Sequence, residues 1–119
     1  MKLAIVGSRD IKNIFIAEYL PTDVTEIVSG GAKGVDTIAK NYALSHNLKY
    51  TEFLPDYKAY GRAAPLRRND EIIEYADEVL AFWNGKSRGT KYVIERTKAL
   101  GKKVCIVRMD KNRDIDEYL

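Results

Sequence analysis

The stretch Ser29-Gly30-Gly31-Ala32-Lys33-Gly34-Val35-Asp36 decides the fold, because it joins a predicted strand to a predicted helix through three glycines. Glu26–Ser29, at the start of the stretch, is a short segment typical of a strand. The third glycine, Gly34, begins the segment Gly34–His46, which carries apolar residues at helical spacing. A strand that becomes a helix through glycines is typical of α/β proteins, which bind phosphate at such turns. This junction therefore predicts an α/β fold.

The same alternation continues along the 119 residues. The expected strands are Lys2–Val6, Glu26–Ser29, Lys49–Phe53, Glu78–Phe82 and Lys103–Val107, and the expected helices are Ile11–Leu20, Gly34–His46, Leu66–Tyr75 and Thr90–Leu100. Strands that alternate with helices predict a doubly wound, mostly parallel sheet with helices on both faces. We expect one Rossmann-like three-layer domain over residues 1–119, with five strands in the order 3-2-1-4-5.

Composition excludes several classes of protein and site. The 20 basic and 17 acidic side chains give a net charge of +3, so an anion site has to be local. Cys105 is the only cysteine and His46 the only histidine, which argues against an internal disulfide, a metal site and a Ser/His/Asp triad. We expect no cofactor. We find no signal peptide and no segment long enough to cross a membrane, and we expect a cytoplasmic protein without a membrane partner.

Three further motifs follow predicted strands or strand ends: Gly7-Ser8-Arg9, Gly61 to Asn69, and Gly85-Lys86-Ser87-Arg88-Gly89-Thr90. In an open parallel sheet all four loops lie along the edge where α/β folds bind ligands. Glycines let the backbone approach a phosphate, and arginines supply forked donors that suit its oxygens. The sequence therefore predicts a nucleotide-like anion as ligand, although it has neither a Walker loop nor the GxGxxG fingerprint.

Each expected site residue has a functional and a plainer interpretation. Glycines and Thr90 would cradle phosphate, Arg9, Arg68 and Asn69 would complete the pocket, and Asp36 would accept from a ribose hydroxyl or a base amine. The plainer interpretations are a tight turn for the glycines, a helix cap for Ser8 and a salt bridge for Arg9. The expected ligand-binding residues are Gly7, Ser8, Arg9, Ser29, Gly30, Gly31, Gly34, Asp36, Arg68, Asn69, Gly85, Ser87, Gly89 and Thr90.

The motifs GSR at 7–9, SGGAKGVD at 29–36, RRN at 67–69 and GKSRGT at 85–90 together resemble the SLOG superfamily, and within it the small YspA/cpYpsA-related proteins. The resemblance covers nearly the whole chain. It implies a Rossmann-like domain that binds nucleotides or their derivatives as a sensor or processing protein. Homodimers are common in that superfamily, and an apolar face on an outer helix would support one here, although a buried core helix would give the same pattern.

Two relatives within the superfamily suggest alternatives. The LOG phosphoribohydrolases release a base from nucleoside monophosphates and carry PGGxGTxxE, but the position of that glutamate is Val93 here. Glu95 lies about 200° further around the helix and does not replace it. A carboxylate for N-glycosidic cleavage would then have to come from another residue. The candidates are Asp36, Asp70 and Glu71.

The other relative is the DNA-processing protein family DprA, whose Rossmann core resembles this chain in its GSR-like start, its SG-x-A-x-G-x-D loop and its Arg-Asn step, here Arg68-Asn69. It implies single-stranded DNA as a partner, with arginines along the phosphates and aromatic rings against the bases. The residues available are Arg62, Arg67, Arg68, Tyr57, Tyr60 and Trp83. Many of them belong to the long connection Leu54–Pro65, which would cover a site. Acidic residues follow directly, so we rank DNA below a small nucleotide, and we expect Trp83 to pack rather than stack.

Overall fold

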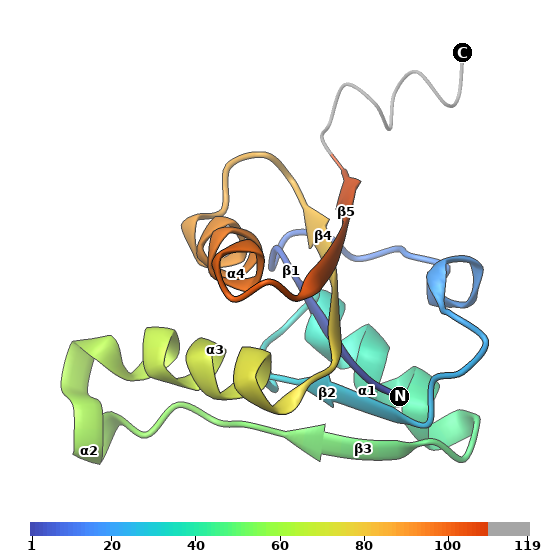
Figure 1. Cartoon of the computed structure of the whole chain (residues 1–119), viewed down its shortest axis with the longest axis horizontal. Coiled ribbons are helices and arrows are strands. Elements are labelled where there is room, and N and C mark those ends of the chain that lie inside the picture. The colour runs from blue at the N-terminus through green and yellow to red at the C-terminus, as the bar shows by residue number, and fades with distance from the viewer. Residues whose placement is uncertain (110–119) are drawn as a thin grey trace.

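The computed structural model describes residues 1–109, and these form an α/β structure built on one five-stranded parallel sheet (Figure 1). The strands are β1 (Lys2–Gly7), β2 (Glu26–Ser29), β3 (Lys49–Glu52), β4 (Glu78–Trp83) and β5 (Lys103–Arg108). Their order is β3-β2-β1-β4-β5, and every neighbouring pair is parallel, which confirms the predicted topology. Residues 110–119 of the expected domain lie outside the described part.

Helices cover both faces of the sheet (Figure 1). In chain order they are the 3-10 helix η1 (Ile16–Tyr19), α1 (Val35–Ser45), α2 (Tyr57–Tyr60), the 3-10 helix η2 (Gly61–Ala63), α3 (Ala64–Tyr75) and α4 (Arg88–Ala99). The long helices α1, α3 and α4 confirm three predicted helices, with ends that differ by one or two residues. The connection after β3 was expected to be a loop, yet it contains α2 and η2.

The predicted helix over Ile11–Leu20 is wrong, since only η1 forms there. The chain after β1 passes directly against the start of α1: a Cβ built on Gly34 would lie 2.7 Å from the carbonyl oxygen of Arg9 and 3.1 Å from that of Ile11. This close backbone contact keeps residues 9–11 out of a helix. Of the apolar residues, Ile11 and Ile16 are buried while Phe15 is 71% exposed, so the segment lacks one continuous buried face.

The centre of the sheet is buried on both sides, as expected of parallel strands. On the face covered by α1, the core is built around Ile5, Ile27 and Phe82. On the face covered by α3 and α4, it is built around Val28, Ile72 and other branched residues. Neighbouring residues of one strand thus enter different cores, which explains why β1 and β4 appear in the sequence as apolar runs, whereas the edge strands β3 and β5 are more exposed.

The histidine and the tryptophan both make contacts within the fold, and Trp83 packs as expected. The ring of His46 is exposed and stacks on Tyr42 at a centroid distance of 3.9 Å. Trp83 is half-buried and donates its Nε1–H to the carbonyl of Ser87 at 3.1 Å, so it packs against the start of α4. Within residues 1–109, no helix is both long and apolar enough to cross a membrane.

At the amino-terminal edge of the sheet, the carboxylate of Glu26 is buried and satisfied by neighbouring donors. Its Oε2 accepts from the hydroxyls of Tyr75 at 2.6 Å and Thr51 at 2.7 Å, and Lys49 Nζ lies 3.6 Å from Oε1. Burial alone would raise the pKa of Glu26, but these hydroxyls, together with Lys49 and Lys2, outweigh it and lower the pKa. The ionised carboxylate therefore ties β2 to β3 and α3.

We predict that stability falls as the pH drops through the lowered pKa of Glu26, because the native state favours its ionised form while the unfolded chain binds the proton more readily. Tyr75→Phe removes one charged hydrogen bond and should cost about 1.5–3 kcal/mol at pH 7. Urea unfolding at pH 7 and at acid pH measures both effects.

The cost of Tyr75→Phe should shrink at acid pH, where the carboxyl is protonated. Tyr92→Phe is the matched control, because the Tyr92 hydroxyl bonds the half-buried Asp70 and should matter less. Equal costs for Tyr75→Phe at both pH values would contradict this account of Glu26.

Candidate functional site

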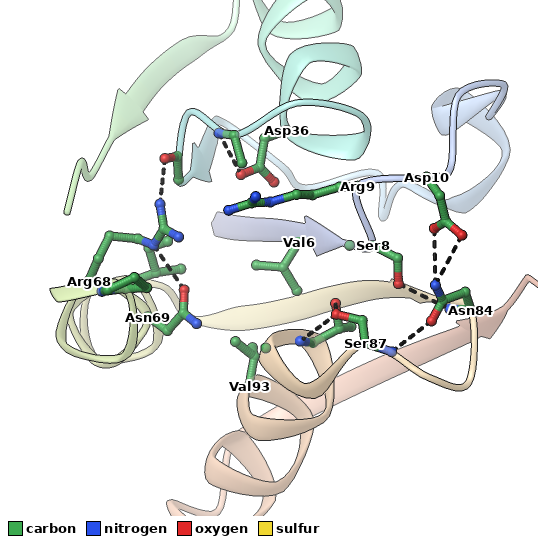
Figure 2. Close-up of a pocket in the computed structure, with 17 residues that line it drawn as sticks. Val6, Ser8, Arg9, Asp10, Asp36, Arg68, Asn69, Asn84, Ser87 and Val93 are labelled. Atoms are coloured by element: carbon green, nitrogen blue, oxygen red, sulfur yellow. Dashed lines mark hydrogen bonds between the residues drawn. The ribbon is translucent and has the colours of Figure 1, made fainter. Parts of the chain in front are cut away.

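A cavity of about 450 Å³ opens at the carboxyl edge of the sheet, where β1 and β4 lie side by side. Its walls come from the turns after β1 and β4, the loop before α1 and the start of that helix, and the amino-terminal parts of α3 and α4 (Figure 2). In this fold β1 and β4 mark the point where the strand order reverses, and open α/β sheets bind ligands there. The volume lies in the range of small-molecule sites.

The structure brings most of the expected site residues to this cavity. Those that line it are Gly7, Ser8, Arg9, Gly30, Asp36, Arg68, Asn69, Ser87, Gly89 and Thr90. Four expected residues, Ser29, Gly31, Gly34 and Gly85, are not part of the lining. Ser29 donates its hydroxyl to the carbonyl of Ile5 at 3.2 Å, and the three glycines adopt positive φ angles at turns. The ligand-binding role of the whole set stays a prediction.

The turn after β1 is fixed by β4. The N–H of Ser8 donates to the carbonyl of Phe82 at 3.0 Å, and Ser8 Oγ accepts from the N–H of Asn84 at 3.1 Å. Ser8 is 1% exposed and no helix begins after it, so the capping interpretation is wrong. Gly7 has no room for a side chain, because a Cβ would lie 2.8 Å from the Phe82 carbonyl and closer still to Val35.

Asn84, which the sequence analysis missed, organises the turn after β4. Its Oδ1 accepts from the N–H groups of Lys86 and Ser87, both at 2.8 Å. Its Nδ2 donates to both oxygens of Asp10 at 3.0 and 3.2 Å, which joins the two turns across the pocket. The sequence signal was weak: asparagine is common in turns, where its side chain bonds nearby backbone N–H groups.

The start of α4 differs in detail from the expectation. The helix begins at Arg88, and Ser87 caps it by accepting from the N–H of Thr90 at 3.3 Å, with the two hydroxyl oxygens 3.2 Å apart. Thr90 is 4% exposed, its N–H donates to Ser87, and its hydroxyl shares a hydrogen bond with the Ser87 hydroxyl. The N–H of Gly89 has no protein partner within residues 1–109, and no atom lies within 4 Å of a Cβ built on Gly89.

Two arginines and an asparagine present donors to the pocket (Figure 2). Arg68 on α3 donates from Nη1 to the carbonyl of Gly30 at 2.6 Å and from Nε to Asn69 Oδ1 at 2.9 Å. These bonds hold the guanidinium in place and leave Arg68 Nη2 and Asn69 Nδ2 without a partner in the described chain. The Arg9 guanidinium extends into the pocket from the opposite wall and has no ion pair or hydrogen bond among residues 1–109.

Asp36, at the start of α1, is the buried carboxylate of the site. It is 7% exposed, and its Oδ2 accepts from the N–H of Ala32 at 3.0 Å. Burial raises its pKa, against the lowering effects of the Ala32 and Gly30 N–H groups, the Ser29 hydroxyl and the Arg68 guanidinium. The side chain is thus surrounded by donors that favour its ionised form, without an ion pair to Arg9.

The remaining wall is apolar and was not predicted as part of the site. Val6, Ile72 and Val93 line the pocket, and all three are also members of the core beneath α3 and α4. Val93, which stands at the sequence position of the glutamate in the LOG pattern, thus lines the pocket. Glu95 lies on the outer face of α4, 3.9 Å from Lys91.

Of the carboxylates considered for hydrolysis, Asp36 lines the pocket, whereas Asp70 and Glu71 do not. Asp70 accepts from the Tyr92 hydroxyl at 2.7 Å. Among the described residues, no group of three or more His, Cys, Asp or Glu side chains is placed to hold a metal ion.

The sequence profile of the DNA recombination-mediator protein A family matches residues 1–60, about half of the chain. The chain belongs to this family. The match supports the DprA resemblance and includes the turn after β1 and the loop before α1 with Asp36, while Arg68, Asn69 and the start of α4 lie outside it. Searches of curated proteins and of solved structures gave no match.

Two pocket glycines should respond oppositely to substitution. Gly7→Ala forces a Cβ against Val35 and the Phe82 carbonyl, and overpacking of this kind costs about 1–3 kcal/mol. Gly89→Ala meets no atom and lies in a helix, so stability should stay unchanged or rise by up to about 1 kcal/mol. Urea unfolding of the two variants measures the difference, and a destabilised Gly89→Ala would show that the space beside Gly89 is not open.

Proposed function

We propose that this pocket binds the phosphate of a nucleotide or nucleotide derivative. The observation that carries the proposal is the convergence of donors that have no acceptor among residues 1–109: the Arg9 guanidinium, Arg68 Nη2 and Asn69 Nδ2. Groups that can only donate favour an anion, and arginine binds phosphate oxygens in pairs. The Gly89 N–H at the start of α4 adds a donor at the positive end of a helix.

The apolar wall supports a nucleotide over a bare phosphate. Val6, Ile72 and Val93 offer a surface against which a flat ring or a sugar can pack, next to the donor cluster. A further question is whether the protein senses its ligand or processes it chemically. Valine in place of the LOG glutamate gives no support to hydrolysis of the LOG type, so we favour binding, as in the YspA-related proteins that the motifs resemble.

Arg9→Ala should weaken binding of a nucleoside monophosphate or diphosphate by about tenfold or more, because it removes a charged hydrogen-bond donor from the site. Arg9 is exposed and makes no described contact that stabilises the fold, so melting without ligand should be unchanged. Isothermal titration with a panel of nucleotides measures the affinity.

Arg96→Ala is the matched control, since Arg96 lies in the last turn of α4 and outside the pocket. Equal affinity of Arg9→Ala and the wild type would remove Arg9 from the site. If the wild-type protein bound no phosphorylated compound, the proposal itself would be wrong.

A second candidate function is binding of single-stranded DNA, which family membership and one surface favour. Tyr57 and Tyr60 on α2 are 61% and 45% exposed, and the Arg67 guanidinium lies 5.6 Å from the centre of the Tyr60 ring. This part of the chain extends beyond the sheet beside the first turn of α3 (Figure 1). Exposed rings next to arginines can stack on bases and contact phosphates.

For this candidate, Tyr60→Ala should weaken binding of a single-stranded oligonucleotide by about 5- to 100-fold, the effect of losing one stacked base. The same change should leave mononucleotide affinity unchanged. Fluorescence anisotropy at several salt concentrations measures both. The exposed Tyr19, which packs edge-on against Phe82 outside this surface, serves as a control through Tyr19→Ala. If Tyr60→Ala left the affinity for the oligonucleotide unchanged, that result would contradict a DNA interface on α2.

A further inference from the structure

The pocket has two chemically different parts. One is the donor cluster of Arg9, Arg68 and Asn69, and the other is the carboxylate of Asp36, which can only accept when ionised (Figure 2). We infer that Asp36 binds the ribose hydroxyls of the ligand, so that the pocket selects ribonucleotides over 2′-deoxyribonucleotides. This inference rests on the proposed function and names the ligand class of the same site.

The first argument is the unused acceptor capacity of Asp36. An ionised carboxylate offers about four lone-pair positions. The N–H of Ala32 takes one on Oδ2 at 3.0 Å, and the Ser29 hydroxyl and the Gly30 N–H also favour the charged form, which leaves room for a further donor from the pocket. No lysine or arginine within residues 1–109 forms an ion pair with it. Such a group repels a phosphate placed beside it and favours a hydroxyl or an amine, since a buried acceptor without a donor is costly.

The second argument is the position of Asp36 beside the donor cluster in the same pocket, which favours the sugar over the base as its partner. Gly30 lies between the two parts: its carbonyl accepts from Arg68 at 2.6 Å, and its N–H is near enough to Asp36 to lower the pKa of the carboxyl. The charge of Arg68 is itself felt at Asp36. In a nucleotide the group next to the phosphate is the ribose, whereas base amines lie further away, so an acceptor beside the phosphate site meets the sugar hydroxyls.

The third argument is the rigidity of Asp36. It is 7% exposed, stands in the first turn of α1, and is held by the N–H of the loop that precedes the helix. A fixed acceptor at a buried position penalises a ligand that lacks the matching hydroxyl, because the carboxylate is then left without its donor. The 2′-hydroxyl is the group that separates RNA-type from DNA-type ligands.

The test compares ribonucleoside and 2′-deoxyribonucleoside 5′-monophosphates of the same four bases by isothermal titration, with inorganic pyrophosphate as a probe without sugar. The wild-type protein should bind the ribose form about tenfold or more tightly than the deoxy form, as loss of one charged hydrogen bond implies. Asp36→Asn should reduce that ratio to within about threefold while pyrophosphate affinity does not fall.

Asp56→Asn is the matched control, because Asp56 caps α2 outside the pocket and asparagine also caps. Its ratio of ribose to deoxy affinity should equal that of the wild type. The wild-type ratio is a test on its own, so the inference stays falsifiable even if Asp36→Asn does not fold.

The outcomes separate the inference from the proposed function. Equal wild-type affinity for the two sugars overturns the ribose assignment and leaves phosphate binding standing. Selection among bases that Asp36→Asn abolishes, with no selection between sugars, also overturns it and assigns Asp36 to a base amine. If neither nucleotides nor pyrophosphate bind, the proposed function itself is wrong.

Discussion

The site depends on the contact between the ends of β1 and β4. These neighbouring parallel strands continue into different segments, so both turns have to pass each other at one edge of the sheet. Gly7 permits this approach, because any Cβ there would strike Val35 and the Phe82 carbonyl. Ser8 then joins the turns through two hydrogen bonds, to Phe82 and from Asn84. The pocket is the space that this arrangement leaves above the strands.

The charges of the pocket are balanced locally, which explains how a chain with a net charge of +3 can hold an anion site. Arg68 connects three elements: it stands on α3, bonds Gly30 after β2, and counteracts the rise that burial causes in the pKa of Asp36 on α1. Arg9 adds a second positive charge from the turn after β1. Backbone N–H groups and Arg68 offset part of the burial cost of Asp36, and Arg9 forms no ion pair with an acidic side chain among residues 1–109.

The strands could be predicted from the sequence to within one residue. The central strands β1 and β4 are marked by apolar runs that are buried on both faces, while the more exposed edge strands β3 and β5 were placed by the alternation of strands and helices. The three long helices could be predicted for a related reason: each has one continuous apolar face. Ile11–Leu20 has helical spacing but lacks such a face, and the contact of residues 9–11 with Gly34 prevents a helix there. That contact joins residues more than 20 positions apart, so no local pattern could indicate it.

The pocket was predictable where a motif carries chemistry, as at Arg9 and Arg68, and not where a residue serves two purposes. Val6, Ile72 and Val93 belong to a core, and only the geometry shows that they also face a cavity.

The glycines also show that geometry separates roles that the sequence does not. The sequence suggests one role, phosphate binding, for all of them. Gly7 is required by packing, and Gly34 by a positive φ and by the backbone of Arg9. Gly30 makes room for the Arg68 guanidinium, and only Gly89 borders open space at the pocket. A glycine-rich motif at the edge of a sheet is therefore evidence for close approach in general, and the approaching group is in several cases the protein itself.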